Sequence, residues 1–91
     1  MASPDEPGGT QVTVRYFAAA RAAAGVDSEA VTLRPGTTVA DLVASLAART
    51  ELLASVLNRC SYLRDGIAVR DQTTVLCSGD TIDALPPFAG G

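Results

Sequence analysis

The chain has 91 residues, of which 47% are hydrophobic and 19% are charged, and its formal net charge is −3. A chain of this length forms one small domain that buries ~60–65% of its unfolded surface, which leaves little room for an enclosed active-site cavity. All seven basic residues are arginines spread singly along the sequence, so we expect no nucleic-acid interface, which needs a clustered basic face, and the acidic balance favours a partner with a basic groove.

The first nine residues contain Pro4, Pro7, Gly8 and Gly9, a composition typical of a flexible lead-in. We therefore divide the chain into a lead-in over residues 1–9, a folded domain over residues 10–85 and an extended tail over residues 86–91. The lead-in has no basic segment and no apolar run, so we expect no signal peptide. No stretch of the sequence has the length of a membrane span, and we expect a cytoplasmic protein without a membrane partner.

The first half of the domain is predicted to hold two strands and a short helix. Val12, Val14 and Tyr16 alternate with polar residues, which indicates a half-buried strand over residues 12–16. Residues 18–24 are mostly alanine, the best helix former, and Gly25 suits the position just past a helix end. Residues 29–34 form the next predicted strand, and a turn follows at residues 35–36.

The clearest helix begins after residue 37, because Thr38 and Asp41 have the spacing of a capping box. Apolar side chains then recur at helical spacing, in a first set of Val39, Leu42, Val43 and Leu46. A second helical segment, or an extension of the first, carries Leu52, Leu53, Val56 and Leu57. We expect both sets to lie in the core.

The remaining domain residues predict short strands separated by turns. A strand over residues 61–64 meets an Asp-Gly turn at residues 65–66 and returns over residues 67–70, and a polar loop and a short apolar piece follow. The last strand covers residues 81–85, with Ile82 and Ala84 on one face, and ends at two prolines that cannot donate to a ladder. This order of elements predicts an α+β fold with a mixed sheet packed on one main helix.

The domain itself carries no recognisable catalytic group of residues. There is no histidine and no lysine, and neither a GxGxxG motif nor a P-loop occurs. Asp80 and Asp83 are interpreted as a turn residue and a residue on a solvated strand face. Cys60 and Cys77 lack metal-site spacing and are interpreted as free buried thiols, so we expect no bound metal.

The sequence ends in Gly90-Gly91, which follow Pro86-Pro87-Phe88-Ala89. Glycine has no side chain to add to a core. Such an ending is either a frayed terminus, as many Gly-rich ends are, or a slim carboxylate that another protein's active site can accept. The empty catalytic inventory of the domain favours the second interpretation.

The chain resembles the small subunits of molybdopterin synthase, a family of ubiquitin-like β-grasp sulfur carriers, from residue 12 to residue 91. The tail is the most specific part, because two prolines, two further residues and Gly-Gly are typical of this family. The Asp65-Gly66-Ile67-Ala68 region departs from the family's usual sequence at the short hairpin. The matching segments are Val14-Arg15-Tyr16-Phe17-Ala18, Thr38-Val39-Ala40-Asp41-Leu42, Ser78-Gly79-Asp80-Thr81-Ile82 and the tail from Leu85 to Gly91.

The resemblance implies that Gly91 carries the working group. In the family, an ATP-dependent enzyme of the ubiquitin-activating type adenylates the C-terminal carboxylate, and a sulfur donor protein converts it to a thiocarboxylate. The large catalytic subunit, in a heterotetramer with the carrier, then uses the sulfur to build the dithiolene of molybdopterin. The resemblance thus implies a non-catalytic subunit that binds no cofactor itself, while ATP serves the activating enzyme.

The residue types of the tail agree with that role. Gly90 and Gly91 can pass a narrow channel, Pro86 and Pro87 stiffen the tail base, and Phe88 is expected to anchor an interface, with Ala89 inserted beside it. Three alternatives stay open: a sulfur carrier for thiamine, cysteine or tRNA thiolation, a ubiquitin-like protein modifier, or a plain binding module with a frayed end.

Overall fold

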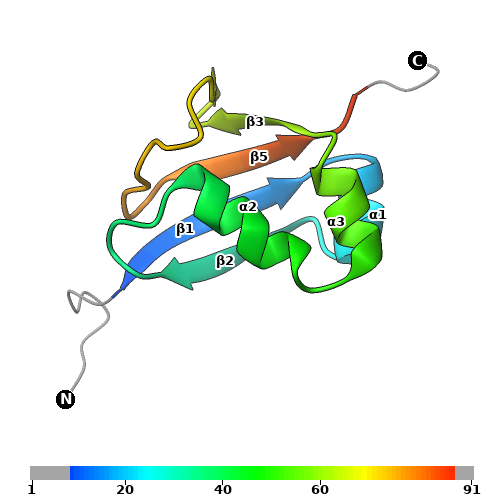
Figure 1. The fold of residues 1–91 in the computed structure, drawn as a ribbon, viewed down its shortest axis with the longest axis horizontal. Helices are drawn as coiled ribbons and strands as arrows, with labels where there is room; N and C mark the ends of the chain where they lie inside the picture. Colours follow the sequence, from blue (N-terminus) through cyan, green and yellow to red (C-terminus); the bar gives the residue numbers. More distant parts are fainter. Residues whose placement is uncertain (1–8, 88–91) are drawn as a thin grey trace.

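The computed structural model describes residues 9–87 and places a mixed sheet behind the helix α2, which lies across one face of the sheet (Figure 1). The five strands have the order β2-β1-β5-β3-β4, in which β1 and β5 are parallel and the other neighbours antiparallel. The predicted α+β class is confirmed. In chain order the elements are β1 (Thr10–Tyr16), α1 (Ala19–Ala24), β2 (Ser28–Leu33), α2 (Val39–Ala47), α3 (Glu51–Leu57), β3 (Ser61–Arg64), β4 (Ile67–Ala68) and β5 (Thr81–Leu85).

Strand β1 divides its side chains between the two faces of the sheet. Val12, Val14 and Tyr16 are at most 2% exposed and belong to the core, as their alternation predicted. The residues between them, Thr13 and Arg15, are exposed on the opposite face. Because β1 pairs with β2 on one side and with β5 on the other, its position in the sheet is fixed from both edges.

The alanine-rich segment forms the short helix α1, as expected. The helix ends at Gly25, whose N–H donates to the Arg21 carbonyl oxygen over 2.9 Å. Gly25 has a φ of 83°, a left-handed conformation that costs glycine little. Ala20 is fully buried, so the small side chains let the helix pack closely on the core.

Helix α2 begins at the predicted capping box. The Thr38 hydroxyl accepts from the Asp41 N–H at 3.1 Å, and the Asp41 carboxylate accepts from the Thr38 N–H at 3.2 Å. The stripe faces the sheet as expected: Val39, Leu42 and Leu46 are each at most 2% exposed, and Val43 packs against them.

The second apolar set forms a separate helix, α3, which packs against α1 and α2. A new N-cap starts it, because the Thr50 hydroxyl accepts from the Leu53 N–H at 3.0 Å. Leu53 and Leu57 are buried, but Leu52 is 63% exposed, so its predicted place in the core is wrong. Leu53, Val56 and Leu57 already fill the inward face at i, i+3 and i+4, and Leu52 lies about 100° away from Leu53 around the helix.

Strands β3 and β4 form the predicted hairpin around the Asp-Gly turn. Asp65 and Gly66 have φ values of 50° and 84°, the pair of positive angles that a type I′ turn requires. The returning strand is shorter than the predicted residues 67–70, since β4 holds only Ile67–Ala68. After it the chain turns toward α2, where the Val39 N–H donates to the Thr74 carbonyl oxygen at 3.0 Å.

One core lies between the sheet and the helices. Strand β5 supplies Ile82 and Ala84 to it, each 1% exposed, and this confirms the face predicted for the last strand. The other buried hydrophobic residues are Val12, Val14, Tyr16, Ala20, Val39, Leu42, Leu46, Leu53, Leu57, Tyr62 and Leu76. The apolar stripes of the helices and strands are therefore buried in this core. The C-terminal end of β5 lies at the edge of the domain (Figure 1).

Candidate functional site

The titratable groups of the described domain are arranged for packing rather than for catalysis. Burial raises the pKa of the Tyr16 and Tyr62 hydroxyls and of the Cys60 thiol, which keeps all three protonated at neutral pH. Cys60 and Cys77 are free, as predicted, but Cys77 is exposed, so the prediction that both are buried is wrong. Within residues 9–87, no three His, Cys, Asp or Glu side chains gather where they could hold a metal ion.

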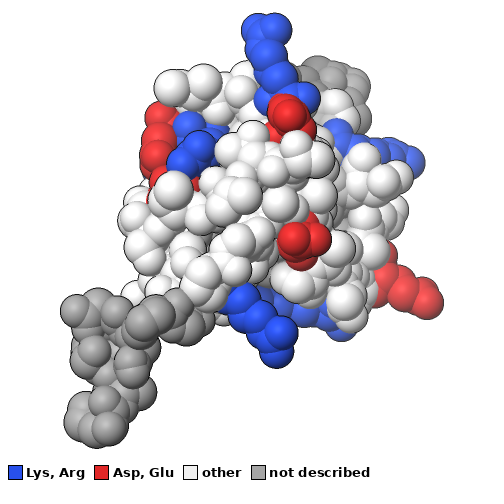
Figure 2. All heavy atoms as spheres, turned by 60° about the vertical axis from the view of Figure 1, so that its left-hand side comes forward, with Lys and Arg blue, Asp and Glu red and all other residues white. Residues whose placement is uncertain are grey.

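Basic and acidic groups are mixed on the face of the molecule shown in Figure 2, some of them side by side, and no continuous patch of one sign is visible on that face. None of the helices within residues 9–87 is long and apolar enough to span a bilayer. The charge pattern therefore suits contacts between proteins made through single, placed charges.

The predicted site lies at the C-terminal end of β5, and the structure describes its first part only. Pro86 is half-buried and Pro87 is exposed directly after the strand. Phe88, Ala89, Gly90 and Gly91 lie outside the described residues. The structure thus defines the base from which the tail starts, and the roles predicted for all six tail residues stay predictions.

The strand that carries the tail is held on both sides. β5 lies between β1 and β3, with Val14 opposite Ile82 on one side and Tyr62 opposite Ala84 on the other. The Phe17 N–H donates to the Ala84 carbonyl oxygen at 3.3 Å and extends the pairing beyond β1. Because the two prolines that follow have no N–H, the ladder ends there, and the tail leaves from a rigid central strand.

An ion pair joins β1 and β5 near the tail base. The Arg15 guanidinium donates from Nε to Asp83 Oδ1 at 2.7 Å and from Nη2 to Asp83 Oδ2 at 2.8 Å. This pairing raises the pKa of Arg15, and the guanidinium carbon lies 5.4 Å from the centre of the Phe17 ring. Since the Asp83 side chain is only 6% exposed, the prediction that it lies on a solvated strand face is wrong.

On the face of the sheet opposite α2, apolar side chains lie around that ion pair. Leu63 lies opposite Asp83 on this face, and Leu85 follows two residues later in β5; both are half-buried. Phe17 is 37% exposed at the end of β1. This open face, defined by Arg15, Phe17, Leu63, Asp83 and Leu85, therefore offers apolar contact area around a fixed polar centre at the tail end of the sheet.

A groove borders the tail base on the helix side. It has a volume of about 180 Å³ and lies between α1, α3 and the two prolines. Its lining residues are Ala19, Ser55, Val56, Arg59, Pro86 and Pro87. Four of the six carry apolar side chains, and Arg59 supplies the charge. We call this feature the tail-base groove.

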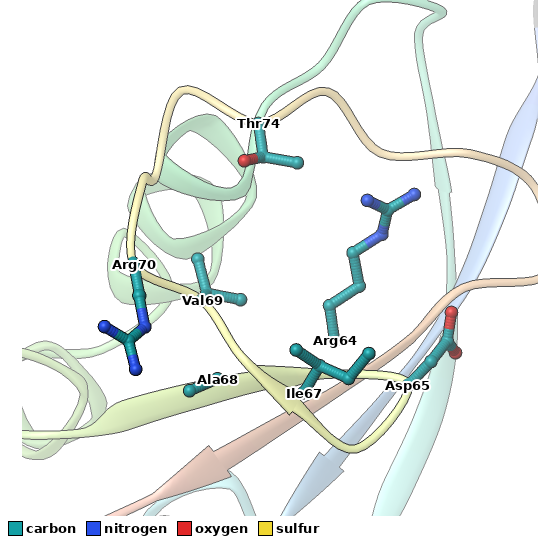
Figure 3. Close-up of a pocket in the computed structure, with 7 residues that line it drawn as sticks. All are labelled: Arg64, Asp65, Ile67, Ala68, Val69, Arg70 and Thr74. Carbon is teal, nitrogen blue, oxygen red and sulfur yellow. The ribbon is translucent and has the colours of Figure 1, made fainter.

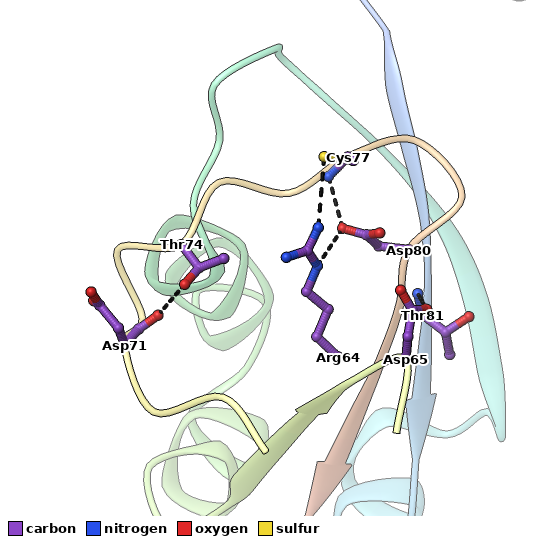
Figure 4. A network of polar contacts seen from close by, with 7 residues as sticks. All are labelled: Arg64, Asp65, Asp71, Thr74, Cys77, Asp80 and Thr81. Carbon is purple, nitrogen blue, oxygen red and sulfur yellow. Dashed lines mark hydrogen bonds and ion pairs between the residues drawn. The ribbon is translucent and has the colours of Figure 1, made fainter. Parts of the chain in front are cut away.

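A second polar network holds the turn that leads into β5 (Figure 4). The Asp80 carboxylate accepts from Arg64 Nε and from the Cys77 N–H, both at 2.8 Å. The Asp65 carboxylate accepts from the Thr81 N–H at 3.0 Å. Asp80 is 7% exposed, so it is a turn residue as predicted and is also a buried ion-pair partner. This network fixes the entry of β5.

A shallow pocket of about 230 Å³ lies beside the β3–β4 hairpin (Figure 3). Its lining residues are Arg64, Asp65, Ile67, Ala68, Val69, Arg70 and Thr74. Arg64 is committed to Asp80 in the network just described, and the pocket lining contains no cysteine or histidine. We therefore assign no catalytic role to this pocket.

The sequence pattern points to the tail but gives no sign of the features that surround its base. Arg15 and Asp83 are 68 residues apart, and Arg59 and Pro87 come from different elements. The alternation of β1 places Arg15 on the outer face, but only the pairing of β1 with β5 reveals its partner. A domain that holds the base of its tail in a central strand, and in which we recognise no catalytic group within residues 9–87, can offer its C-terminus to the active site of another protein.

Comparisons with known proteins agree with that description. Residues 14–91 match the ThiS family. The chain is 35% identical over 82 residues to the "Molybdopterin synthase sulfur carrier subunit" of Chlamydomonas reinhardtii, covering 89% of this chain and 99% of that protein. A putative molybdopterin converting factor, subunit 1, from Pyrococcus furiosus has a similar structure, with a TM-score of 0.78, 29% identity and coverage of 86% and 98%.

Two further structures mark the range of the fold. The complex of subunits 1 and 2 of the molybdopterin-converting factor from Helicobacter pylori matches with a TM-score of 0.63, 24% identity and coverage of 90% and 100%. The small archaeal modifier protein 1 of Methanosarcina acetivorans matches with a TM-score of 0.76, 27% identity and coverage of 91% and 98%. The fold alone is therefore common to proteins named as molybdopterin converting factor subunits and as modifiers.

Proposed function

Because the chain belongs to the ThiS family, we propose that it is the sulfur carrier subunit of a molybdopterin synthase and that the carboxyl group of Gly91 is its working group. The observation that carries the proposal is the match to a named sulfur carrier subunit over 99% of that protein's length, at 35% identity. The structure contributes a fixed β5 and a tail base at Pro86 and Pro87, the arrangement that such a carrier needs.

The chemistry at Gly91 takes two steps on partner enzymes. First, the carboxylate attacks the α-phosphorus of ATP, pyrophosphate leaves, and an acyl adenylate forms. Second, a sulfur nucleophile from a donor protein attacks the acyl carbon, and AMP leaves with the electron pair of the broken bond. When that nucleophile is the outer sulfur of a persulfide, an acyl disulfide results; a thiol then attacks the donor's sulfur and forms a disulfide with it, and the thiocarboxylate leaves on the carrier with the electron pair of the broken S–S bond. None of these steps needs an acid, base or nucleophile from the carrier domain.

The large subunit of the synthase is the proposed recipient. It accepts the tail in a channel and transfers the sulfur to a cyclic pterin precursor, and two loaded carriers supply the two sulfurs of one dithiolene. The open face around Arg15 and Asp83 lies at the tail end of the sheet, so a protein that receives the tail can contact it. Its half-buried Leu63 and Leu85 supply apolar area for such a contact.

The residue types of the tail suit insertion into a channel. Proline fixes φ near −65°, so Pro86 and Pro87 reduce the conformational freedom that binding must remove from the tail. Gly90 and Gly91 lack Cβ and so let the partner's groups approach the backbone of the reacting residue. The proposal thus assigns stiffness to the base of the tail and slimness to its end.

The experiment combines the purified full chain with its activating enzyme, ATP and a sulfur donor, and measures its intact mass. We expect the gain that corresponds to one sulfur replacing one oxygen, located on Gly91 by fragmentation. A variant that lacks Gly90 and Gly91 serves as the negative control, and one that lacks residues 1–8 serves as the matched control that keeps the tail. A full chain that never forms an adenylate or a thiocarboxylate would remove the proposal.

Two alternatives are separated by what the loaded chain then does. The similarity to the small archaeal modifier protein 1 favours testing for protein conjugates, which would survive thiol reductants if they are isopeptide-linked. A carrier for thiamine, cysteine or tRNA thiolation would load sulfur but give no pterin dithiolene with the large synthase subunit. Formation of that product by the loaded chain selects the proposed function over both.

A further inference from the structure

The tail-base groove combines apolar walls with a single arginine at the point where the tail starts. We propose that this groove receives a carboxylate side chain from the rim of the channel that accepts the tail, and that Arg59 binds it. The inference rests on the proposed function and identifies a contact that the large subunit makes besides the tail itself.

Arg59 carries a positive charge that no carboxylate within residues 9–87 pairs with. Arg15, Arg21, Arg49 and Arg64 each pair with a carboxylate of this chain. Within residues 9–87, Arg59 makes no ion pair and no side-chain hydrogen bond, although it is exposed in the turn that follows α3. In a chain with a net charge of −3, this cation is available for an anion that comes from outside the described domain.

Arg59 lies beside the two prolines from which the tail starts. Pro86 and Pro87 line the groove together with Arg59, and residue 88 follows directly. A channel that takes in residues 88–91 must therefore end its rim at Pro87, within contact distance of the groove. The rim and the groove then form one continuous interface, so the partner covers Arg59 whenever the tail is fully inserted.

A partner that covers the groove removes water from the guanidinium group of Arg59. The walls around Arg59 are largely apolar: Ala19 from α1, Val56 from α3 and the two prolines. Covering a guanidinium there without an anion would remove its water and leave its charge unpaired, which is costly. A carboxylate can accept two parallel hydrogen bonds from the guanidinium fork, and exclusion of water strengthens the pair. An aspartate or glutamate is therefore the fitting occupant.

The C-terminal carboxylate of this chain is a second anion that Arg59 has within reach. Four residues follow Pro87, and a fully extended chain spans ~3.3–3.6 Å per residue, so the Gly91 carboxylate could also reach Arg59. When the tail is inserted, its own terminal group must lie inside the channel at the reacting centre, so it cannot occupy the groove outside the channel at the same time. A carboxylate on the large subunit is available in every encounter, and we assign the groove to it.

The test measures the dissociation constant of the full carrier for the large subunit by calorimetry. Arg59→Glu is compared with Arg34→Glu, a matched charge reversal at an exposed arginine that also makes no ion pair within residues 9–87. Arg34 follows Leu33, which pairs with Thr10, so it lies at the end of the sheet away from the tail. Thermal unfolding of both variants establishes that they fold like the parent.

We expect Arg59→Glu to weaken binding by about tenfold or more, because reversal of the charge replaces attraction with repulsion at a covered site. Arg34→Glu should bind within about twofold of the parent, as charges outside an interface affect mainly long-range steering. In the product assay with loaded carrier, Arg59→Glu should raise the carrier concentration for half-maximal rate and leave the maximal rate unchanged. This split distinguishes a binding residue from one that acts on sulfur transfer.

Two results would overturn the inference. Equal binding by Arg59→Glu and Arg34→Glu would mean that Arg59 meets no anion in the complex. A shift of the Arg59 Nε–H resonance in the free carrier when residues 88–91 are deleted, together with unchanged binding by Arg59→Glu, would assign the groove to the chain's own end. If the parent chain itself fails to bind the large subunit, the proposed function fails first, a result that differs from both.

Discussion

Leu42 and Leu52 are both apolar positions of helical stripes, but only one of them is in the core. Leu42 is 0% exposed on α2, and Leu52 is 63% exposed on α3. Replacing each by alanine removes the same three carbon atoms from two different environments. The pair therefore measures what burial alone contributes to stability, with the chemistry of the substitution held constant.

The expected magnitudes follow from the exposed fractions. Three buried carbons at ~0.8 kcal/mol each give a transfer loss of about 2.4 kcal/mol at Leu42. The cavity left behind raises the total into the range of about 2.5–4.5 kcal/mol. At Leu52 roughly a third of the side chain is covered, so the transfer loss is about 0.9 kcal/mol and no closed cavity forms. A domain of this size has a free energy of unfolding of about 5–15 kcal/mol, so Leu42→Ala removes a large part of it.

The assays are urea unfolding and thermal unfolding, both followed by far-ultraviolet circular dichroism, with the slope of the urea transition checked for each variant. Leu42→Ala should lower the thermal midpoint by roughly 10–20 °C or more, and Leu52→Ala by several degrees, at ~4–8 °C per kcal/mol. Equal losses at the two positions would refute the assignment of the inward face of α3. Below their midpoints, both variants should still load sulfur as the parent does, because neither residue touches the tail base.

Three further substitutions test local features of the fold. Glu29→Gln should weaken the pH dependence of stability. Burial raises the pKa of Glu29, but hydrogen bonds from Tyr16 and Arg49 outweigh that effect and hold the pKa below its usual value. The parent should therefore lose more stability than the variant as pH falls through that pKa, and equal losses in urea midpoints measured at several pH values would contradict this. Thr38→Ala should cost about 1 kcal/mol in chemical unfolding by removing the cap from Asp41 N, and an unchanged midpoint would contradict the capping box. Gly25→Ala should cost about 1–2 kcal/mol because its φ is 83°, and a more stable variant would contradict that backbone geometry.

Local signals in the sequence predicted the helices and strands well, because each depends on residues close together in the chain. The capping box of Thr38 and Asp41, the alanine run before Gly25 and the Asp65-Gly66 turn all form as expected. β3 and β5 occupy the predicted residues because the Asp-Gly turn and the prolines fix one boundary of each. These features need no knowledge of the tertiary fold.

The errors arose where tertiary pairing decides the environment. Asp83 was predicted to be solvated, since a polar residue in an alternating strand usually is, but Arg15 on a strand 68 residues away covers it. Leu52 was predicted to be buried, but Leu53, Val56 and Leu57 fill the inward face of α3 instead. The tail-base groove combines α1, α3 and the residues after β5, so no local pattern could reveal it.

The central claim is that Gly91 carries the chemistry and that the domain holds it for other proteins. The most direct measurement is the yield of pterin dithiolene when thiocarboxylated carrier is mixed with the large synthase subunit and the cyclic precursor, with no other sulfur source present. The account predicts one product for every two carriers consumed, and none from the variant that lacks Gly90 and Gly91. Product formed in equal yield by that truncated variant would contradict it.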